Sequence, residues 1–129
     1  MKMALSVHRR LAVLLTALVA VADGYANSHH QAWGDWLAAA LFAYMSAYCT
    51  QNFLRCREVH CAITAPGFLA AAVLMLLRLA GVMTYGYGIP WAVFVVSACC
   101  GYCVQELYQR RTGSIFFHSD EDRTKKNSR

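Results

Sequence analysis

The chain has 129 residues, enough for a single domain, and its composition separates it from ordinary soluble proteins. Hydrophobic residues make up 58% of the sequence and charged residues only 15%, whereas soluble domains contain about 45–50% and about 25%. Such a chain is expected in lipid rather than in water. The net charge of +5 does not indicate nucleic-acid binding, because the basic residues are almost confined to a few connections and the two ends of the chain.

The first predicted helix covers residues 8–26, which include an uninterrupted apolar run at 11–22. Ala20, Val21 and Ala22 have the small-x-small form of a cleavage site, so the run is compatible with a removed secretory signal. A second pattern is a seam of small residues at every fourth position, through which membrane helices pack closely: Ala12, Thr16, Ala20 and Gly24. Because a removed signal peptide has no use for such a seam, the pattern favours a retained membrane helix.

The second and third predicted helices are separated by a polar loop. The second covers residues 33–53, and polar side chains follow it. The third covers residues 64–85, because Thr64 is suited to the N-cap and Pro66 is tolerated in a first turn, where its missing N–H would have no partner. Residues 56–61 are therefore expected in or beside this loop.

The fourth predicted helix covers residues 89–109, and Gly113 is a suitable residue to end it. The long apolar segments lack the polar face that a soluble helical bundle needs. The sequence therefore predicts an all-α fold, a four-helix transmembrane bundle over residues 1–112, or three helices if the first is a cleaved signal. Residues 113–129 are predicted to form a mobile cytoplasmic tail.

The basic residues predict the orientation of the helices. They precede the first helix, lie between the second and third, and follow the fourth: Lys2, Arg9, Arg10, Arg55, Arg57, Arg110, Arg111, Arg123, Lys125, Lys126 and Arg129. Because cytoplasmic loops carry an excess of Lys and Arg, we expect a multi-pass protein of the inner (plasma) membrane with both termini in the cytoplasm. Arg78 is the exception inside a helix. It is either a functional residue, the partner of Asp23 or Asp35, or a snorkelling side chain.

Six cysteines are expected on the cytoplasmic side of the bilayer middle. A reducing compartment there favours free thiols or metal thiolates over disulfides. Cys56 and His60 are four residues apart, which places them on one face if the segment is helical, and Cys61 adds a neighbouring thiol. Thiolate and imidazole are the ligands that soft ions prefer.

A second thiol group lies in the fourth predicted helix, where Cys99 and Cys103 have the same spacing and Cys100 is adjacent. Helix packing would have to bring the two groups together. The alternative is that these thiols only pack as small apolar side chains between helices. The complete set of predicted metal ligands is Cys56, His60, Cys61, Cys99, Cys100 and Cys103.

Two resemblances bear on these residues. Cys56, His60 and Cys61, followed by Thr64-Ala65-Pro66-Gly67-Phe68, resemble a motif of small uncharacterised prokaryotic integral membrane proteins. A fainter likeness is to the mercuric-ion uptake membrane proteins, which have a vicinal cysteine pair within a membrane helix. Cys99 and Cys100 match that pair here, although they lie in the last helix rather than the first. The second resemblance implies binding or transport of a soft metal ion.

The sequence contains no Gly-x-Ser-x-Gly, phosphate-binding loop or His-Glu-x-x-His motif, so an enzyme is not expected. We expect a membrane protein that binds or transports a soft metal ion through cytoplasmic-side thiols. The alternative is a membrane scaffold or accessory subunit whose basic tail docks a partner or anionic lipid. A thiol-redox function would depend on the pair Cys100 and Cys103. The expected partners are the lipid bilayer, a metal ion, and either a second copy of the chain or another protein, but not nucleic acid.

Overall fold

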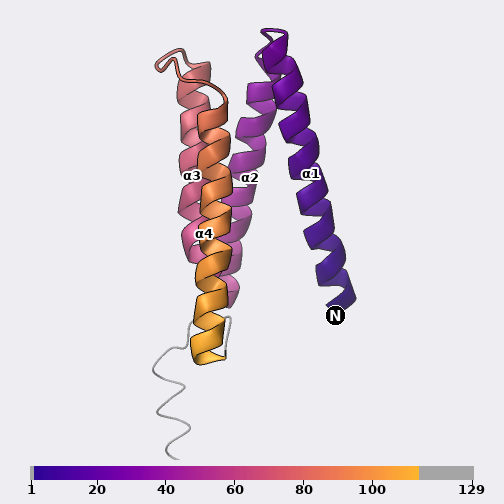
Figure 1. Ribbon diagram of the computed structural model, residues 1–129, viewed down its shortest axis with the longest axis vertical. Coiled ribbons are helices and arrows are strands. Elements are labelled where there is room, and N and C mark those ends of the chain that lie inside the picture. The colour runs from indigo at the N-terminus through magenta and orange to yellow at the C-terminus, as the bar shows by residue number, and fades with distance from the viewer. Residues whose placement is uncertain (1, 114–129) are drawn as a thin grey trace, which may run out of the picture.

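The computed structural model describes residues 2–113, and within that range the side chains of 11–55 and 57–113. This part of the chain folds into four α-helices, which confirms the predicted all-α fold. The helices are α1 (Lys2–Ser28), α2 (Trp33–Cys56), α3 (Val59–Leu79) and α4 (Gly88–Thr112) (Figure 1).

Consecutive helices run in opposite directions along the long axis of the molecule (Figure 1). α3 packs against both α2 and α4, whereas α1 contacts α2. α1 lies beside α2 near the turn between them and diverges from the bundle toward its own N-terminus (Figure 1). One end of the molecule therefore carries the start of α1, the α2–α3 connection and the end of α4. The other end carries the α1–α2 and α3–α4 connections.

Within the described residues, three helical segments are long and apolar enough to cross a membrane, namely Leu11–Ser28 of α1, all of α3 and all of α4. α2 is not among them, and it carries Asp35 near its start and Asn52 and Arg55 near its end. α2 instead contributes fully buried side chains to the interior, such as that of Phe42. The exposed apolar side chains of the other helices are those that lipid would cover.

The α2–α3 connection is shorter than the predicted loop. α2 continues to Cys56, and Arg57 adopts a left-handed conformation (φ 53°), with its N–H bonded to the Phe53 carbonyl oxygen at 2.9 Å. Glu58, in an extended conformation, is the N-cap of α3. The chain thus reverses at Arg57 and Glu58, and α3 begins at Val59 rather than at residue 64.

Thr64 and Pro66 therefore do not start the helix. The buried Thr64 hydroxyl donates to the His60 carbonyl oxygen at 3.0 Å, one turn earlier in the same helix. Pro66 lies inside α3. Because proline has no backbone N–H, one hydrogen bond of the helix is missing there. The Ala65 carbonyl oxygen beside it accepts a hydrogen bond from Ser46 Oγ of α2 at 2.9 Å, which ties the two helices together at this point.

The ends of α3 and α4 are each followed by a glycine with positive φ. α3 ends at Leu79 rather than at residue 85, and Gly81 follows with φ 70°. Gly113, with φ 71°, is the C-cap of α4, as predicted. Left-handed backbone of this kind favours glycine because it has no Cβ. The predicted tail lies, apart from Gly113, outside the described residues.

Aromatic rings fill the interior of the α2–α3–α4 bundle. The ring centroids of Phe42 and Phe94 are 4.7 Å apart, and those of Phe68 and Phe94 are 4.4 Å apart. All three rings are buried. α3 and α4 approach closely at Gly67, where a Cβ atom would collide with the Ser97 side chain. The two polar ends of the bundle are therefore separated by a tightly packed apolar centre.

Candidate metal centre

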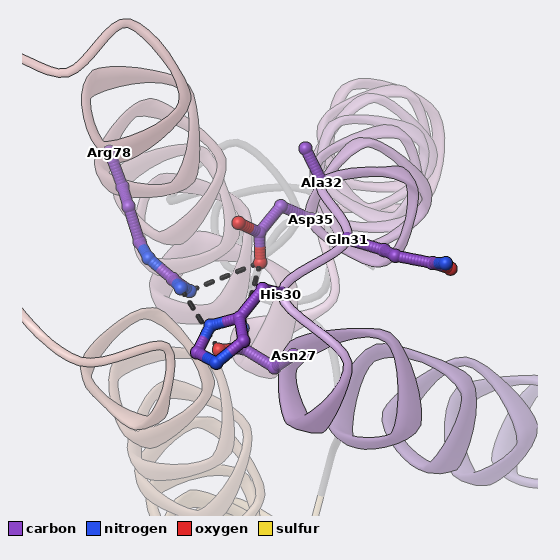
Figure 2. A pocket seen from close by; sticks show the side chains of 6 residues that line it. All are labelled: Asn27, His30, Gln31, Ala32, Asp35 and Arg78. Atoms are coloured by element: carbon purple, nitrogen blue, oxygen red, sulfur yellow. Dashed lines mark hydrogen bonds and ion pairs between the residues drawn. The ribbon is translucent and has the colours of Figure 1, made fainter.

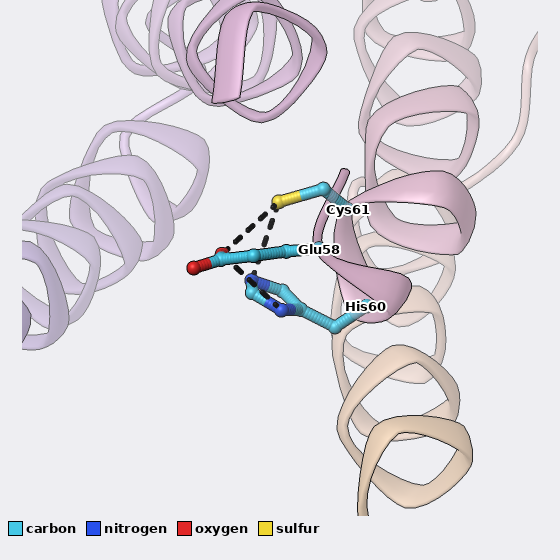
Figure 3. Close-up of side chains that lie close together, drawn as sticks. All are labelled: Glu58, His60 and Cys61. Carbon is cyan, nitrogen blue, oxygen red and sulfur yellow. Dashed lines mark hydrogen bonds and ion pairs between the residues drawn. The ribbon is translucent and has the colours of Figure 1, made fainter. Parts of the chain in front are cut away.

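The candidate site lies at the α2–α3 connection. Because the chain reverses at Arg57 and α3 starts directly after Glu58, three potential metal ligands emerge beside one another at the start of the helix. Glu58, His60 and Cys61 converge on a common point (Figure 3), and one ligand atom from each lies within 4.8 Å of the other two.

The separations among these three side chains are close to the edges of a metal coordination polyhedron, although the two distances from His60 involve different ring nitrogens. Cys61 Sγ lies 3.4 Å from His60 Nε2 and 3.9 Å from Glu58 Oε2, and His60 Nδ1 lies 3.7 Å from Glu58 Oε2. Sulfur, nitrogen and oxygen ligands bound to Zn²⁺ at tetrahedral angles lie about 3.4–3.6 Å apart, given their bond lengths to zinc. Because one atom of each side chain lies within 4.8 Å of the other two, the three side chains would have to move closer together to bind one ion through a single His60 nitrogen.

Cys61 lies beside the unpaired N–H groups at the start of α3. Cys61 lies in the first turn of α3 and is 1% exposed. The N-cap Glu58 makes no side-chain capping hydrogen bond to α3. The first N–H groups of a helix lack intrahelical acceptors and carry the positive end of the helix dipole. A bound cation would displace the thiol proton of Cys61 and compensate the charges of both anionic ligands.

The side chain of Asn52, near the end of α2, contacts two of these ligands. Its side-chain Nδ2 donates to Glu58 Oε2 at 2.6 Å and lies 3.5 Å from Cys61 Sγ. Such outer contacts fix the orientation of metal ligands. The site therefore depends on α2 as well as on the start of α3.

A second thiol adjoins the site from α2. Cys49 is 7% exposed, and its thiol lies near enough to the side chains of Cys61 and Thr64 to interact with both. It lies about one helical turn before Asn52 on the same helix. Cys49 is not part of the group of ligand atoms within 4.8 Å of one another, so it would have to move toward Cys61 to supply a fourth donor.

His60 also contacts α4. Its imidazole stacks on the Tyr102 ring with centroids 5.2 Å apart and an angle of 12° between the planes. Its buried Nδ1 atom makes no hydrogen bond within the described part of the chain. The stacking fixes the plane of the imidazole, and the Nδ1 atom remains available as a ligand or as a proton acceptor.

The structure brings together two of the predicted ligands, His60 and Cys61. Cys56 is the last residue of α2, and its side chain lies outside the described residues. The thiols of α4 do not join the site, because all three are exposed on the outside of the bundle: Cys99, Cys100 and Cys103. Two contributors were not among the predicted ligands, namely Glu58 and Cys49. The signal for Glu58 is its place directly before the helix that carries His60 and Cys61.

Arg78, the charged residue inside the third helix, is paired. Its guanidinium Nη1 lies 3.1 Å from Asp35 Oδ1, and its Nη2 donates to Asn27 Oδ1 at 3.2 Å. Of the predicted alternatives, the structure shows the ion pair with an aspartate. This polar group lies at the end of the bundle opposite the candidate metal site.

Comparison of the chain with protein-family models, with curated proteins and with solved structures gives no match. The function is therefore inferred from the residues that converge at the α2–α3 connection.

Proposed function

We propose that this protein is an integral membrane protein that binds one soft or borderline divalent metal ion, with Zn²⁺ as the best fit. The ligands are Glu58, His60 and Cys61. The observation that carries the proposal is that one ligand atom from each of these side chains lies within 4.8 Å of the other two, in a site that is largely shielded from solvent.

The mixture of ligand types selects the ion. A thiolate and an imidazole suit Zn²⁺ and Cu⁺, but a carboxylate is a hard ligand that Cu⁺ does not favour. Zn²⁺ accepts sulfur, nitrogen and oxygen together and adopts tetrahedral geometry. With Glu58, His60 and Cys61 in place, the fourth position is either taken by Cys49 or left to an exchangeable ligand.

The charge distribution supports a cytoplasmic location for the metal site. The end of the bundle that carries the site also carries the basic residues of the α2–α3 connection, such as Arg55 and Arg57, and those at the end of α4, Arg110 and Arg111. Under the positive-inside rule this end faces the cytoplasm. A reducing compartment would keep the cysteines available as thiolate ligands.

Binding is supported more strongly than transport. The packed rings of Phe42, Phe68 and Phe94 fill the centre of the bundle between its two polar ends. An ion that entered this region would lose its polar ligands, at a large cost in free energy. We therefore propose an ion bound at one face of the membrane, as in a metal sensor, store or donor.

The proposal is tested by titrating the full-length protein in detergent with Co²⁺ and displacing the Co²⁺ with Zn²⁺. We expect one ion per chain and a thiolate-to-cobalt charge-transfer band, both lost in Cys61→Ser and in His60→Ala. The matched control is the triple variant Cys99→Ser, Cys100→Ser and Cys103→Ser, whose exposed thiols lie outside the site and whose binding should be unchanged.

Two outcomes would contradict the metal site. Unchanged stoichiometry and absorption in Cys61→Ser would remove the proposed ligand set. Loss of binding in the triple α4 variant alone would move the site to α4. If the wild-type protein binds neither ion, the scaffold or accessory-subunit function becomes the better account.

A further inference from the structure

A second polar cluster lies at the end of the bundle opposite the metal site, where all four helices contribute a side chain. The ion pair of Asp35 (α2) and Arg78 (α3) forms one part of it, joined by Asn27 of α1 (Figure 2). Asp23 of α1 forms the other part, and its Oδ2 accepts a hydrogen bond from Trp91 Nε1 of α4 at 2.6 Å. None of these residues belongs to the proposed metal site.

Asp23 is enclosed on every side. It is 0% exposed, and α2 passes so close to it that a Cβ atom at Gly34 would lie 2.9 Å from Asp23 Oδ1. Asp23 Oδ1 has no hydrogen-bond partner among the described residues. The Asp23 carboxyl group lies within hydrogen-bonding reach of the Asp35 carboxyl group, which is itself 7% exposed.

The charges of this cluster do not balance if both aspartates are ionised. Arg78 supplies one positive charge, and the other groups in contact with the pair, Trp91 and Asn27, are neutral. Two ionised carboxylates would leave an uncompensated negative charge in a buried site, which is costly. Two carboxylates at hydrogen-bonding distance also disfavour joint ionisation strongly. A single proton shared between the two carboxyl groups would give Asp23 Oδ1 a hydrogen-bond partner. It would also make the net charge of the cluster zero.

We propose that Asp23 and Asp35 form a proton-binding site in which the two carboxyl groups share a single proton. Asp35 remains paired with Arg78, and Asp23 remains bonded to Trp91. The proton closes the hydrogen bond between α1 and α2. Loss of this proton would leave two buried carboxylates that repel each other where α1 contacts the bundle.

A pocket gives this site access to water. It has a volume of about 250 Å³ and is lined by polar side chains, including Asp35 and Arg78 (Figure 2). Asp23 is not among its lining residues, so protons would exchange through Asp35. His30, in the α1–α2 turn, is the other titratable side chain that lines the pocket.

The test is infrared spectroscopy of the full-length protein in lipid bilayers at neutral pH, after removal of metal ions with a chelator. We expect a carboxylic-acid C=O band from one protonated carboxyl group per chain, which disappears in both Asp23→Asn and Asp35→Asn. Glu106→Gln is the matched control, because Glu106 is exposed and paired only with Arg110 at the opposite end of the bundle. This variant should keep the band.

Absence of the band from the wild-type protein would overturn the proposal, since a pair bridged by Na⁺ or another cation would show only carboxylate bands. A band that persists in both asparagine variants would assign the proton elsewhere and would also overturn it. If Asp35→Asn fails to fold because Arg78 loses its partner, Asp23→Asn decides alone, with helix content by circular dichroism as the folding check. None of these outcomes depends on whether the metal site exists.

Discussion

The side-chain amide of Asn52 in α2 donates a hydrogen bond of 2.6 Å to the Glu58 carboxylate at the start of α3. This contact joins the end of one helix to the candidate metal site at the start of the next. It gives Glu58 a fixed orientation that the two-residue connection alone does not impose. Asn52 is thus predicted to position a ligand without binding the ion itself.

Asn52→Ala should weaken metal binding by about 10–100-fold, the usual effect of losing an outer partner of a metal ligand. Titration with Zn²⁺ in competition with a chromophoric chelator measures the change. The control is Gln51→Ala, at the neighbouring exposed position, which should bind as the wild type does. Equal affinities for the two variants would mean that Asn52 does not support the site.

Cys49→Ser tests whether the second thiol completes the coordination. The Cys49 thiol interacts with Cys61 from α2. If Cys49 is the fourth ligand, its loss should reduce the charge-transfer absorption of the Co²⁺-loaded protein to about half, as the site changes from two sulfur ligands to one. Binding should persist, in contrast to Cys61→Ser. An unaltered spectrum would leave the fourth position to a ligand other than Cys49.

The close approach of α3 and α4 predicts a stability difference between two glycine substitutions. Gly67→Ala should destabilise the protein by about 1–3 kcal/mol, the usual cost of overpacking, because the added Cβ would collide with Ser97. Gly24→Ala in α1 is the control, since no atom lies within 4 Å of its Cβ position. There alanine should be neutral or stabilising by up to about 1 kcal/mol. Thermal unfolding in detergent distinguishes the two, and an equal effect would argue against the packed α3–α4 interface.

Removal of Arg78 should destabilise the bundle strongly. Arg78→Ala leaves the buried Asp35 without its cation, and breaking a buried ion pair in this way costs about 3–5 kcal/mol. The double variant Arg78→Ala with Asp35→Asn should recover part of that loss, because position 35 no longer carries an unpaired charge. The exposed pair of Arg110 and Glu106 provides the comparison, where Arg110→Ala should change the unfolding midpoint little. A similar effect of both arginine substitutions would contradict a stabilising role for the ion pair of Arg78 with the buried Asp35.

The helices were predictable from sequence because long apolar runs have few alternatives, and Gly113 correctly marked the end of the last one. The start of α3 was not predictable in this way, because Thr64 and Pro66 are equally compatible with positions inside a helix. The decisive feature was the left-handed Arg57. Nothing in the sequence marks that residue, since arginine rarely adopts such a conformation.

The site was predictable only where its residues are neighbours in the chain. His60 and Cys61 could be paired by their position, but Cys49 reaches Cys61 only through the packing of α2 on α3. The α4 thiols were predicted to belong to the site but lie outside it, for a related reason. α4 is apolar around its circumference, so its sequence does not reveal that Gly101 faces the bundle while Cys99, Cys100 and Cys103 face outward.

X-ray absorption spectroscopy at the zinc edge tests the central claim most directly, because it reports the atoms bound to the ion. The Zn²⁺-loaded protein should show a mixed shell, with sulfur at about 2.3 Å and nitrogen or oxygen at about 2.0–2.2 Å. This shell should be absent from Cys61→Ser, which is expected not to hold the ion, and unchanged in the α4 triple variant. A shell composed only of sulfur, or one that Cys61→Ser leaves unchanged, would contradict a site built from Glu58, His60 and Cys61.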